Sequence, residues 1–297
     1  MAAIICLGIA VRDLVFAVPA LPPVPQKLSA SALFRRGGGM AATAAVAAAA
    51  LGGSVEYWGR LGDDETGREL RSELESHRVR VRASITPGSQ TPVAAVLVAD
   101  NGERMLAVFR GHFDAAAGWL PLAQVAAVQA VHADFRWPQG ASALYAAAVR
   151  ARIPRVLDAD AGDPQAVRSL LPLVDHAIFS QGGLAEMTGT ADIDAGLRQA
   201  AMLAGGTVGV TIGAQGSVFL IDGCAHRVAA PVVVARDTNG AGDVFHGAYT
   251  LALAEGQGVL GAARFATAAA ALKCRDGIGW EAVPDRAAVD DFLKGWT

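Results

Sequence analysis

The chain has 297 residues, of which 53% are hydrophobic, and its 25 Lys and Arg against 28 Asp and Glu give a formal net charge of −3. This length suits one large α/β domain or two small ones. The near balance of charge, without a long basic tract, gives no reason to expect a nucleic-acid partner. The longest apolar tract, Met40 to Leu51, is mostly alanine and too short to cross a bilayer, so no membrane partner is expected either.

The cysteines and the N-terminus indicate a cytoplasmic protein. The three cysteines are odd in number, widely separated and without C-x-x-C spacing. Such thiols are typical of reduced, buried side chains in cytosolic proteins. The apolar N-terminus has no basic segment before it, and Arg12 and Asp13 interrupt it, so it predicts a buried strand and not a signal peptide.

Within the first 110 residues, the sequence predicts a buried strand, a proline-rich irregular segment and a hairpin. Ala3 to Val11 is a continuous apolar run, typical of a strand covered on both faces of a parallel sheet. Asp13 sits just past this run, where such sheets bind ligands, so it is a candidate ligand-binding residue; a loop aspartate that caps a turn is the alternative. Prolines break residues 14–36, which predict neither a central strand nor a helix. An Asn101–Gly102 pair between two apolar runs predicts a hairpin over 91–109.

Strand and helix patterns alternate along the rest of the chain. This alternation predicts right-handed βαβ units and an α/β fold with a doubly wound, mostly parallel sheet flanked by helices. Strands are expected at 55–59, 128–135, 154–158, 174–179, 207–212 and 231–235, and helices at 40–51, 68–77, 142–150, 192–204, 244–254, 258–274 and 285–295.

The most informative stretch is the loop and helix start at residues 237–247, which read Asp-Thr-Asn-Gly-Ala-Gly-Asp-Val-Phe-His-Gly. Glycines let backbone N–H groups approach an anion, and the first turn of a helix carries partial positive charge. Gly240, Ala241 and Gly242 are therefore predicted to donate to phosphoryl oxygens. A carboxylate beside them repels phosphate unless it removes a proton from the attacking hydroxyl, so Asp243 is the predicted general base. The alternative is an ordinary first-turn aspartate that stabilises its helix.

This stretch resembles the C-terminal signature of the ribokinase-like (PfkB) carbohydrate kinases, D-T-x-G-A-G-D-x-F. A second block, Gly38-Gly39-Met40-Ala41-Ala42-Thr43-Ala44-Ala45-Val46, resembles their N-terminal signature about 200 residues earlier, so the resemblance covers essentially the whole chain. It implies a main domain of residues 1–13, 37–90 and 111–297, and a small discontinuous β-sheet lid of residues 14–36 and 91–110. It also implies ATP and Mg²⁺ as cofactors, a small-molecule sugar substrate, and a homodimer joined through the lids.

The resemblance further implies a set of binding residues. Thr43 stands where the family usually has an asparagine that donates to the sugar. Ser180 and Gly183 stand where many members have N-x-x-E, whose acid orients hydrated magnesium, so the metal ligands stay unassigned, with Asp158 and Asp160 as candidates. The implied nucleotide-side residues are Thr211, Gly213, Gly216, Asn239, Ala270 and Cys274, and the implied sugar-side residues are Asp13, Gly38, Gly39, Thr43 and Asp243.

Four blocks taken together, at 37–46, 133–137, 175–180 and 242–248, resemble the branch of the family that phosphorylates 6-deoxy-6-sulfofructose. A sulfonated sugar is a permanent anion, and its site needs cations, preferably arginine. Arg136 follows a predicted strand and is the first candidate. Lys27 and Arg110 in the lid are further candidates, although both also fit ordinary surface charges. Residues 108–114, which include His112, are unlike that branch.

The predicted function is an ATP-dependent kinase that transfers the γ-phosphoryl group to a primary hydroxyl of a sugar, which for sulfofructose is the hydroxyl on C1. Kinases for fructose, ribose or 2-keto-3-deoxygluconate are the alternatives within this class. A non-catalytic sugar or nucleotide sensor on the same scaffold is the alternative of another class. The missing N-x-x-E pattern favours the sensor, and the intact G-A-G-D loop disfavours it.

Overall fold

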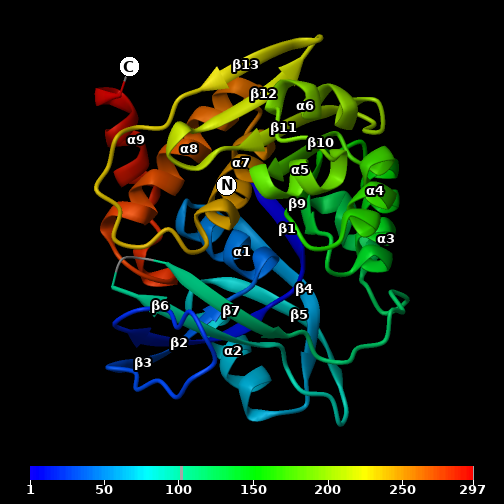
Figure 1. Cartoon of the computed structure of the whole chain (residues 1–297). Helices are drawn as coiled ribbons and strands as arrows, with labels where there is room; N and C mark the ends of the chain where they lie inside the picture. Colours follow the sequence, from blue (N-terminus) through cyan, green and yellow to red (C-terminus); the bar gives the residue numbers. More distant parts are fainter. Residues whose placement is uncertain (101–102, 297) are drawn as a thin grey trace.

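A large, mostly parallel sheet crosses the main body of the computed structural model, which describes residues 1–100 and 103–296 (Figure 1). Neighbouring strands pair in parallel from β11 to β5, whereas β12 and β13 add an antiparallel edge. This confirms the predicted α/β fold class. The strands follow in the spatial order β13 (Cys224–Val228), β12 (Ser217–Ile221), β11 (Thr207–Thr211), β10 (His176–Ser180), β9 (Arg155–Ala159), β8 (Ala130–Asp134), β1 (Ala3–Gly8), β4 (Ser54–Gly62) and β5 (Val79–Thr86).

Helices cover both faces of this sheet and enclose two separate apolar cores. Small side chains allow one of these layers to pack closely: a Cβ on Gly247 of α7 would lie 2.2 Å from the carbonyl oxygen of Ala44 in α1. The first core is formed with α1 (Met40–Ala50), α2 (Glu65–Ser76), α7 (Ala241–Ala254), α8 (Val259–Asp276) and α9 (Arg286–Gly295), and the second with α3 (Pro138–Ala151), α4 (Pro164–Leu170), α5 (Gln181–Thr188) and α6 (Ile193–Ala201). Short 3₁₀ turns lie at Leu122–Ala127, Leu171–Leu173, Gly213–Gln215 and Trp280–Ala282. None of the described helices combines the length and hydropathy needed to cross a bilayer.

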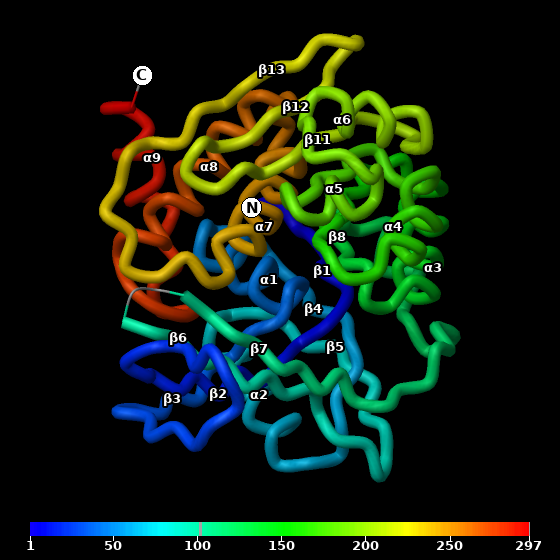
Figure 2. Tube along the Cα trace, in the orientation of Figure 1, coloured from blue at the N-terminus to red at the C-terminus, as the bar shows by residue number. Residues whose placement is uncertain are grey.

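A second, four-stranded sheet forms a lid beneath the large sheet in the view of Figure 2. Its order is β3 (Ala32–Gly38), β2 (Val11–Val18), β6 (Val93–Ala99) and β7 (Arg104–Phe109), with β2 parallel to β6. The predicted hairpin is confirmed as the β6–β7 pair. The Asn101–Gly102 turn predicted to join them lies outside the described residues.

Two predictions about strands are wrong. The apolar run from Ala3 to Val11 is split, because β1 ends at Gly8 and the lid strand β2 begins at Val11. Asp13 therefore lies within β2, paired with Arg36 and Ala94, and not in a loop. The run at 231–235 forms no strand: Val232 and Val234 are 103% and 87% exposed, so hydrophobicity here reflects neither burial nor pairing.

The sequence patterns also missed three elements: β5, α4 and α5. β5 lies at the edge of the large sheet, and polar side chains alternate with apolar ones along it. The two helices are short, with 7 and 8 residues, so they hold too few turns for a clear helical period. Each begins at a side-chain cap, Asp163 for α4 and Ser180 for α5.

Candidate active site

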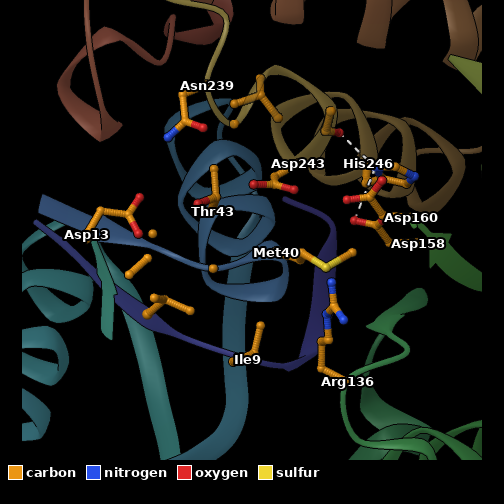
Figure 3. Close-up of a pocket in the computed structure, with 18 of the residues that line it drawn as sticks. Ile9, Asp13, Met40, Thr43, Arg136, Asp158, Asp160, Asn239, Asp243 and His246 are labelled. Carbon is orange, nitrogen blue, oxygen red and sulfur yellow. Dashed lines mark hydrogen bonds and ion pairs between the residues drawn. The ribbon is translucent and has the colours of Figure 1, made fainter. Parts of the chain in front are cut away.

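A cavity of about 360 Å³ lies between the lid and the carboxyl ends of the central strands (Figure 3). It brings together predicted residues that are up to 230 positions apart in the chain: Asp13, Gly38, Gly39, Thr43, Arg136, Thr211, Asn239, Gly240, Gly242 and Asp243. Asp158, Asp160, Ser180 and Arg110 also line it, together with His246, Lys273 and Trp280, which the sequence analysis did not single out.

Several other predicted residues do not line this cavity. Gly216 packs against an edge strand, since a Cβ there would lie 2.0 Å from the carbonyl oxygen of Val228. Cys274 is buried, and its carbonyl oxygen accepts hydrogen bonds from the amides of Arg236 and Asp237. Lys27 is exposed in the connection between β2 and β3. The remaining residues off the lining are Ala241, Gly213 and Ala270.

The turn before α7 presents backbone donors to the cavity. Gly240 caps the helix with a left-handed backbone, φ 72°, which glycine adopts without strain. Asn239 N donates to the Asp237 carboxylate at 2.9 Å and closes the turn. Within the described part of the chain, the amides of Gly242 and Asp243 donate to no acceptor, whereas Ala241 N donates to Thr238 O at 3.3 Å. First-turn amides of this kind form an anion-binding site.

Asp243 extends from the first turn of α7 toward the cavity, beside Thr43 of α1 (Figure 3). Burial and then the neighbouring Asp158 raise the pKa of Asp243 well above its ordinary value, and His246 opposes this shift. A carboxylate with a raised pKa holds a proton more tightly and is a stronger base. The environment of Asp243 therefore suits proton removal from an alcohol better than that of an exposed aspartate.

His246 lies one turn along α7 and connects three elements of the site. Its Nδ1 is 2.7 Å from Gly242 O and 3.4 Å from Asp158 Oδ2, and its Nε2 is 3.2 Å from Ile178 O. A neutral imidazole has one N–H, so it can donate to only one of the two carbonyl oxygens. Burial lowers the pKa of His246, which favours the neutral ring and the shorter bond to Gly242. The ring thereby fixes the Gly242 peptide in the donor turn.

Polar side chains from the lid and from α1 also line the cavity. Asp13 lies close to β3, where a Cβ on Gly38 would be 2.6 Å from its Oδ2, so glycine is required there. Burial raises the pKa of Asp13 to about 6, while Arg12 and a hydrogen bond from the Asn239 side chain oppose the shift. Thr43 Oγ1 accepts a hydrogen bond from Trp280 Nε1 at 2.9 Å, which leaves the threonine hydroxyl proton free to donate.

The acidic residues fit a magnesium ion that is held mainly by phosphates and water. No group of three or more potential ligands that could enclose a metal occurs among residues 1–100 and 103–296. Asp160 lines the cavity, and buried Asp158 Oδ2 has no hydrogen-bond partner among the described atoms. One or two carboxylates beside a triphosphate are the usual ligands of Mg²⁺. Ser180, at the position of the missing motif, instead caps α5 through Gly183 N at 2.9 Å.

Comparison with known proteins assigns this fold and cavity to a family of kinases. Residues 1–282 match the pfkB family carbohydrate kinases, and the chain belongs to this family. The chain is 26% identical to a ribokinase of Arabidopsis thaliana over 98% of its own length and 81% of the relative's. It is 27% identical to a fructokinase of Vibrio alginolyticus over 74% of its length and 77% of the relative's.

Solved structures agree with this assignment. Arabidopsis thaliana ribokinase, complexed with ribose and ATP, superposes with a TM-score of 0.87 at 25% identity, covering 99% of this chain and 98% of that one. A protein of Agrobacterium tumefaciens, provisionally named a ribokinase, gives a TM-score of 0.93 at 29% identity and covers 99% and 98% of the two chains. The protein is therefore an ATP-dependent sugar kinase that uses ATP and Mg²⁺.

The raised pKa of Asp13 predicts a pH-dependent cost in stability. The folded state binds this proton more tightly than the unfolded state, so Asp13 destabilises the fold above pH 6 and is neutral in effect below the ordinary carboxylate pKa. Asp13→Asn should increase the free energy of unfolding at pH 8 by on the order of 2 kcal/mol, and the gain should shrink as pH falls toward 5. Urea denaturation at both pH values measures this, and an equal effect at both contradicts it.

Proposed function

We propose that this kinase phosphorylates a small anionic ketose, with 6-deoxy-6-sulfofructose and its 1-hydroxyl as the leading candidate. The observation that carries this proposal is the convergence of two arginines, Arg110 and Arg136, at the rim of the cavity. The four sequence blocks that resemble the sulfofructose branch support the same substrate.

The two guanidinium groups approach one point from different elements. A Cβ built on Gly162 would lie 3.3 Å from Arg136 Nη1 and 3.9 Å from Arg110 Nη2. Arg136 stacks on Phe135 at 4.2 Å and donates to Ala161 O at 3.2 Å, while its buried Nη1 has no partner among the described atoms. Burial and then Arg110 lower the pKa of Arg136. An anion between the two would relieve their repulsion and supply the missing acceptor.

The proposed chemistry uses the donor turn and Asp243. The sugar hydroxyl oxygen bonds to the γ-phosphorus of ATP, the bond from that phosphorus to the ADP oxygen breaks, and the hydroxyl proton passes to Asp243. Amides of Gly240, Ala241 and Gly242 donate to the transferring phosphoryl oxygens. Asp13, Gly38, Gly39 and Thr43 bind the sugar, and Asn239, Thr211, Gly213, Gly216, Ala270 and Cys274 are proposed on the nucleotide side.

Uncharged and carboxylated sugars are the competing substrates. Ribose and fructose fit the names of the relatives, and 2-keto-3-deoxygluconate carries a carboxylate that two arginines can also bind. Measurement of ADP release with each of the four sugars separates these substrates. Absence of ADP release with every sugar would instead support the sensor.

Asp243→Asn should lower kcat by about two orders of magnitude or more, because the amide cannot accept the hydroxyl proton, while ATP still binds. In the wild type, kcat should fall as pH drops through the raised pKa of Asp243, at a higher pH than for an ordinary carboxylate. Asp163→Asn, at the cap of α4, is the matched control. Full activity of the Asp243 variant would exclude it as the base.

Arg136→Ala should raise KM for sulfofructose by about 10-fold to 100-fold relative to fructose, because it removes one charged partner worth about 1.5–3 kcal/mol. Arg110→Ala should act in the same direction. Arg150→Ala, on the exposed end of α3, serves as the control for loss of one arginine. Steady-state kinetics measure KM for sulfofructose and for fructose in each variant. Equal effects on the two KM values rule out a sulfonate site.

We also propose a homodimer joined through the lids, in a cytoplasmic enzyme. The edge strands β3 and β7 expose Leu33, Phe34, Met105 and Phe109, by 56%, 42%, 47% and 40%, and such edges favour pairing with a partner. In this dimer, Lys27 from the exposed connection between β2 and β3 reaches the partner's cavity. The unpaired cysteines are compatible with a reducing compartment.

Light scattering should therefore give twice the chain mass. Leu33→Asp combined with Phe34→Asp should shift the protein to a monomer, because two buried carboxylates would face an apolar surface. Met202→Asp, at a 79% exposed position away from the lid, is the control. A monomeric wild type at micromolar concentration excludes the dimer.

A further inference from the structure

Lys273 is a buried lysine inside an otherwise small and apolar stretch of α8. Only 1% of the residue is exposed, and its neighbours Ala268, Ala269 and Leu272 are buried in the first core. A buried ammonium costs several kcal/mol unless it is paired and fully hydrogen-bonded. Its partners therefore show what this charge does.

The partners are three oxygens of one turn. Lys273 Nζ donates to Asp237 Oδ2 at 3.0 Å, to Asp237 O at 3.1 Å, and to Asn239 O. An ammonium has three N–H donors, so all of them are used and none remains for a ligand. Although Lys273 lines the cavity, its charge is directed at the protein.

This turn leads directly into the amides at the start of α7. Asp237 and Asn239 precede the cap residue Gly240, and the unpaired amides of Gly242 and Asp243 follow. The other carboxylate oxygen of Asp237 accepts from Arg104 Nη2 at 3.1 Å, so the turn is held from α8 on one side and from the lid strand β7 on the other. Loss of the ammonium would leave two carbonyls and one carboxylate oxygen unpaired at this turn.

We propose that Lys273 is a positioning residue that acts as a fixed internal cation: its ammonium holds the 237–239 turn so that the following amides point at the transferring phosphoryl group. Lys273 touches neither substrate in this role. Once the side chain is removed, the same three oxygens form a suitable ligand set for a monovalent cation. The wild-type enzyme needs no dissolved cation at this turn.

The test uses the full-length enzyme and the sugar that the wild type phosphorylates, so it rests on the proposed function. Lys273→Ala creates space for an ion, and Lys273→Met keeps the length without the charge. Lys294→Met, with a 76% exposed side chain on α9, is the matched control. Activity is measured at constant ionic strength while potassium or ammonium replaces tetramethylammonium, which is too large for the vacated space.

We expect Lys273→Met to lower kcat by about 100-fold with a small change in KM for the sugar, as for the loss of an oriented phosphoryl donor. Lys273→Ala should show the same loss, and potassium or ammonium should restore activity with saturation. The wild type and Lys294→Met should be insensitive to the exchange of cations. Wild-type kcat in Lys273→Met, or a folded Lys273→Ala that no small cation restores, overturns the proposal.

Amide hydrogen exchange gives a second readout that needs no sugar. Exchange across 237–244 should be faster in Lys273→Ala and slow again with potassium, whereas a remote peptide such as 142–150 should not change. Unaltered exchange across the turn contradicts the proposal. If either variant fails to fold, the wild type decides: a saturable requirement for potassium at constant ionic strength overturns the proposal, and independence of potassium supports it. If the wild type phosphorylates none of the sugars, the substrate proposal fails. The hydrogen-exchange result still tests whether Lys273 holds the 237–239 turn.

Discussion

The carboxylate of Asp134 joins the three elements on which the sugar side of the site depends. It accepts backbone hydrogen bonds from Ile9 at 2.8 Å, Ala41 at 3.2 Å and Arg136 at 2.9 Å, and thus ties the end of β1 to the start of α1 and the end of β8. Burial raises the pKa of Asp134, and these donors oppose the shift. Hydrogen bonds to a charged group contribute about 1.5–3 kcal/mol each, so the carboxylate both breaks the first strand and directs its continuation into the lid. Gly8 must lack a side chain, because a Cβ there would lie 2.0 Å from Asp134 Oδ2.

The charged side chains around the cavity suit a phosphoryl transfer. Asp158, Asp160 and Asp243 line the cavity where phosphate is expected, and burial and then the charge of Asp158 raise the pKa of Asp243. Carboxylates so close to a triphosphate are tolerable only with a divalent cation between them and with backbone donors on the other side. The positive charge of Arg136 also acts on this acidic group, because it opposes the rise in the pKa of Asp158. The acidic residues and the two arginines therefore line one and the same cavity.

Local sequence patterns predicted what depends on local forces. The alanine run of α1 and the glycine-rich start of α7 were both predicted, because helical spacing and the backbone freedom of glycine are properties of the segment itself. The break after Gly8 was not, since it is imposed by Asp134, which lies 126 residues later. Val232 and Val234 look like a strand, yet they pair with none of the strands in the described part of the chain. Lys273 was overlooked although its signal is visible: a single lysine interrupts an apolar helix stretch, and such a charge needs buried oxygens that only the fold can supply.

The lid strand β7 connects the donor turn to the residues that we propose to bind the sugar. Arg104 at the start of β7 holds Asp237 and Thr238 of the donor turn, and Arg110, just past the end of the same strand, lines the rim of the cavity. Asn239 extends this connection, because its side chain accepts from Arg104 and donates to Asp13 on β2. A change in the position of β7 must therefore move the donor turn and the proposed sugar-binding groups together. The parallel sheet provides a scaffold that many sugar kinases can share, whereas Arg110 and Arg136 are the side chains that we propose to distinguish an anionic sugar from an uncharged one.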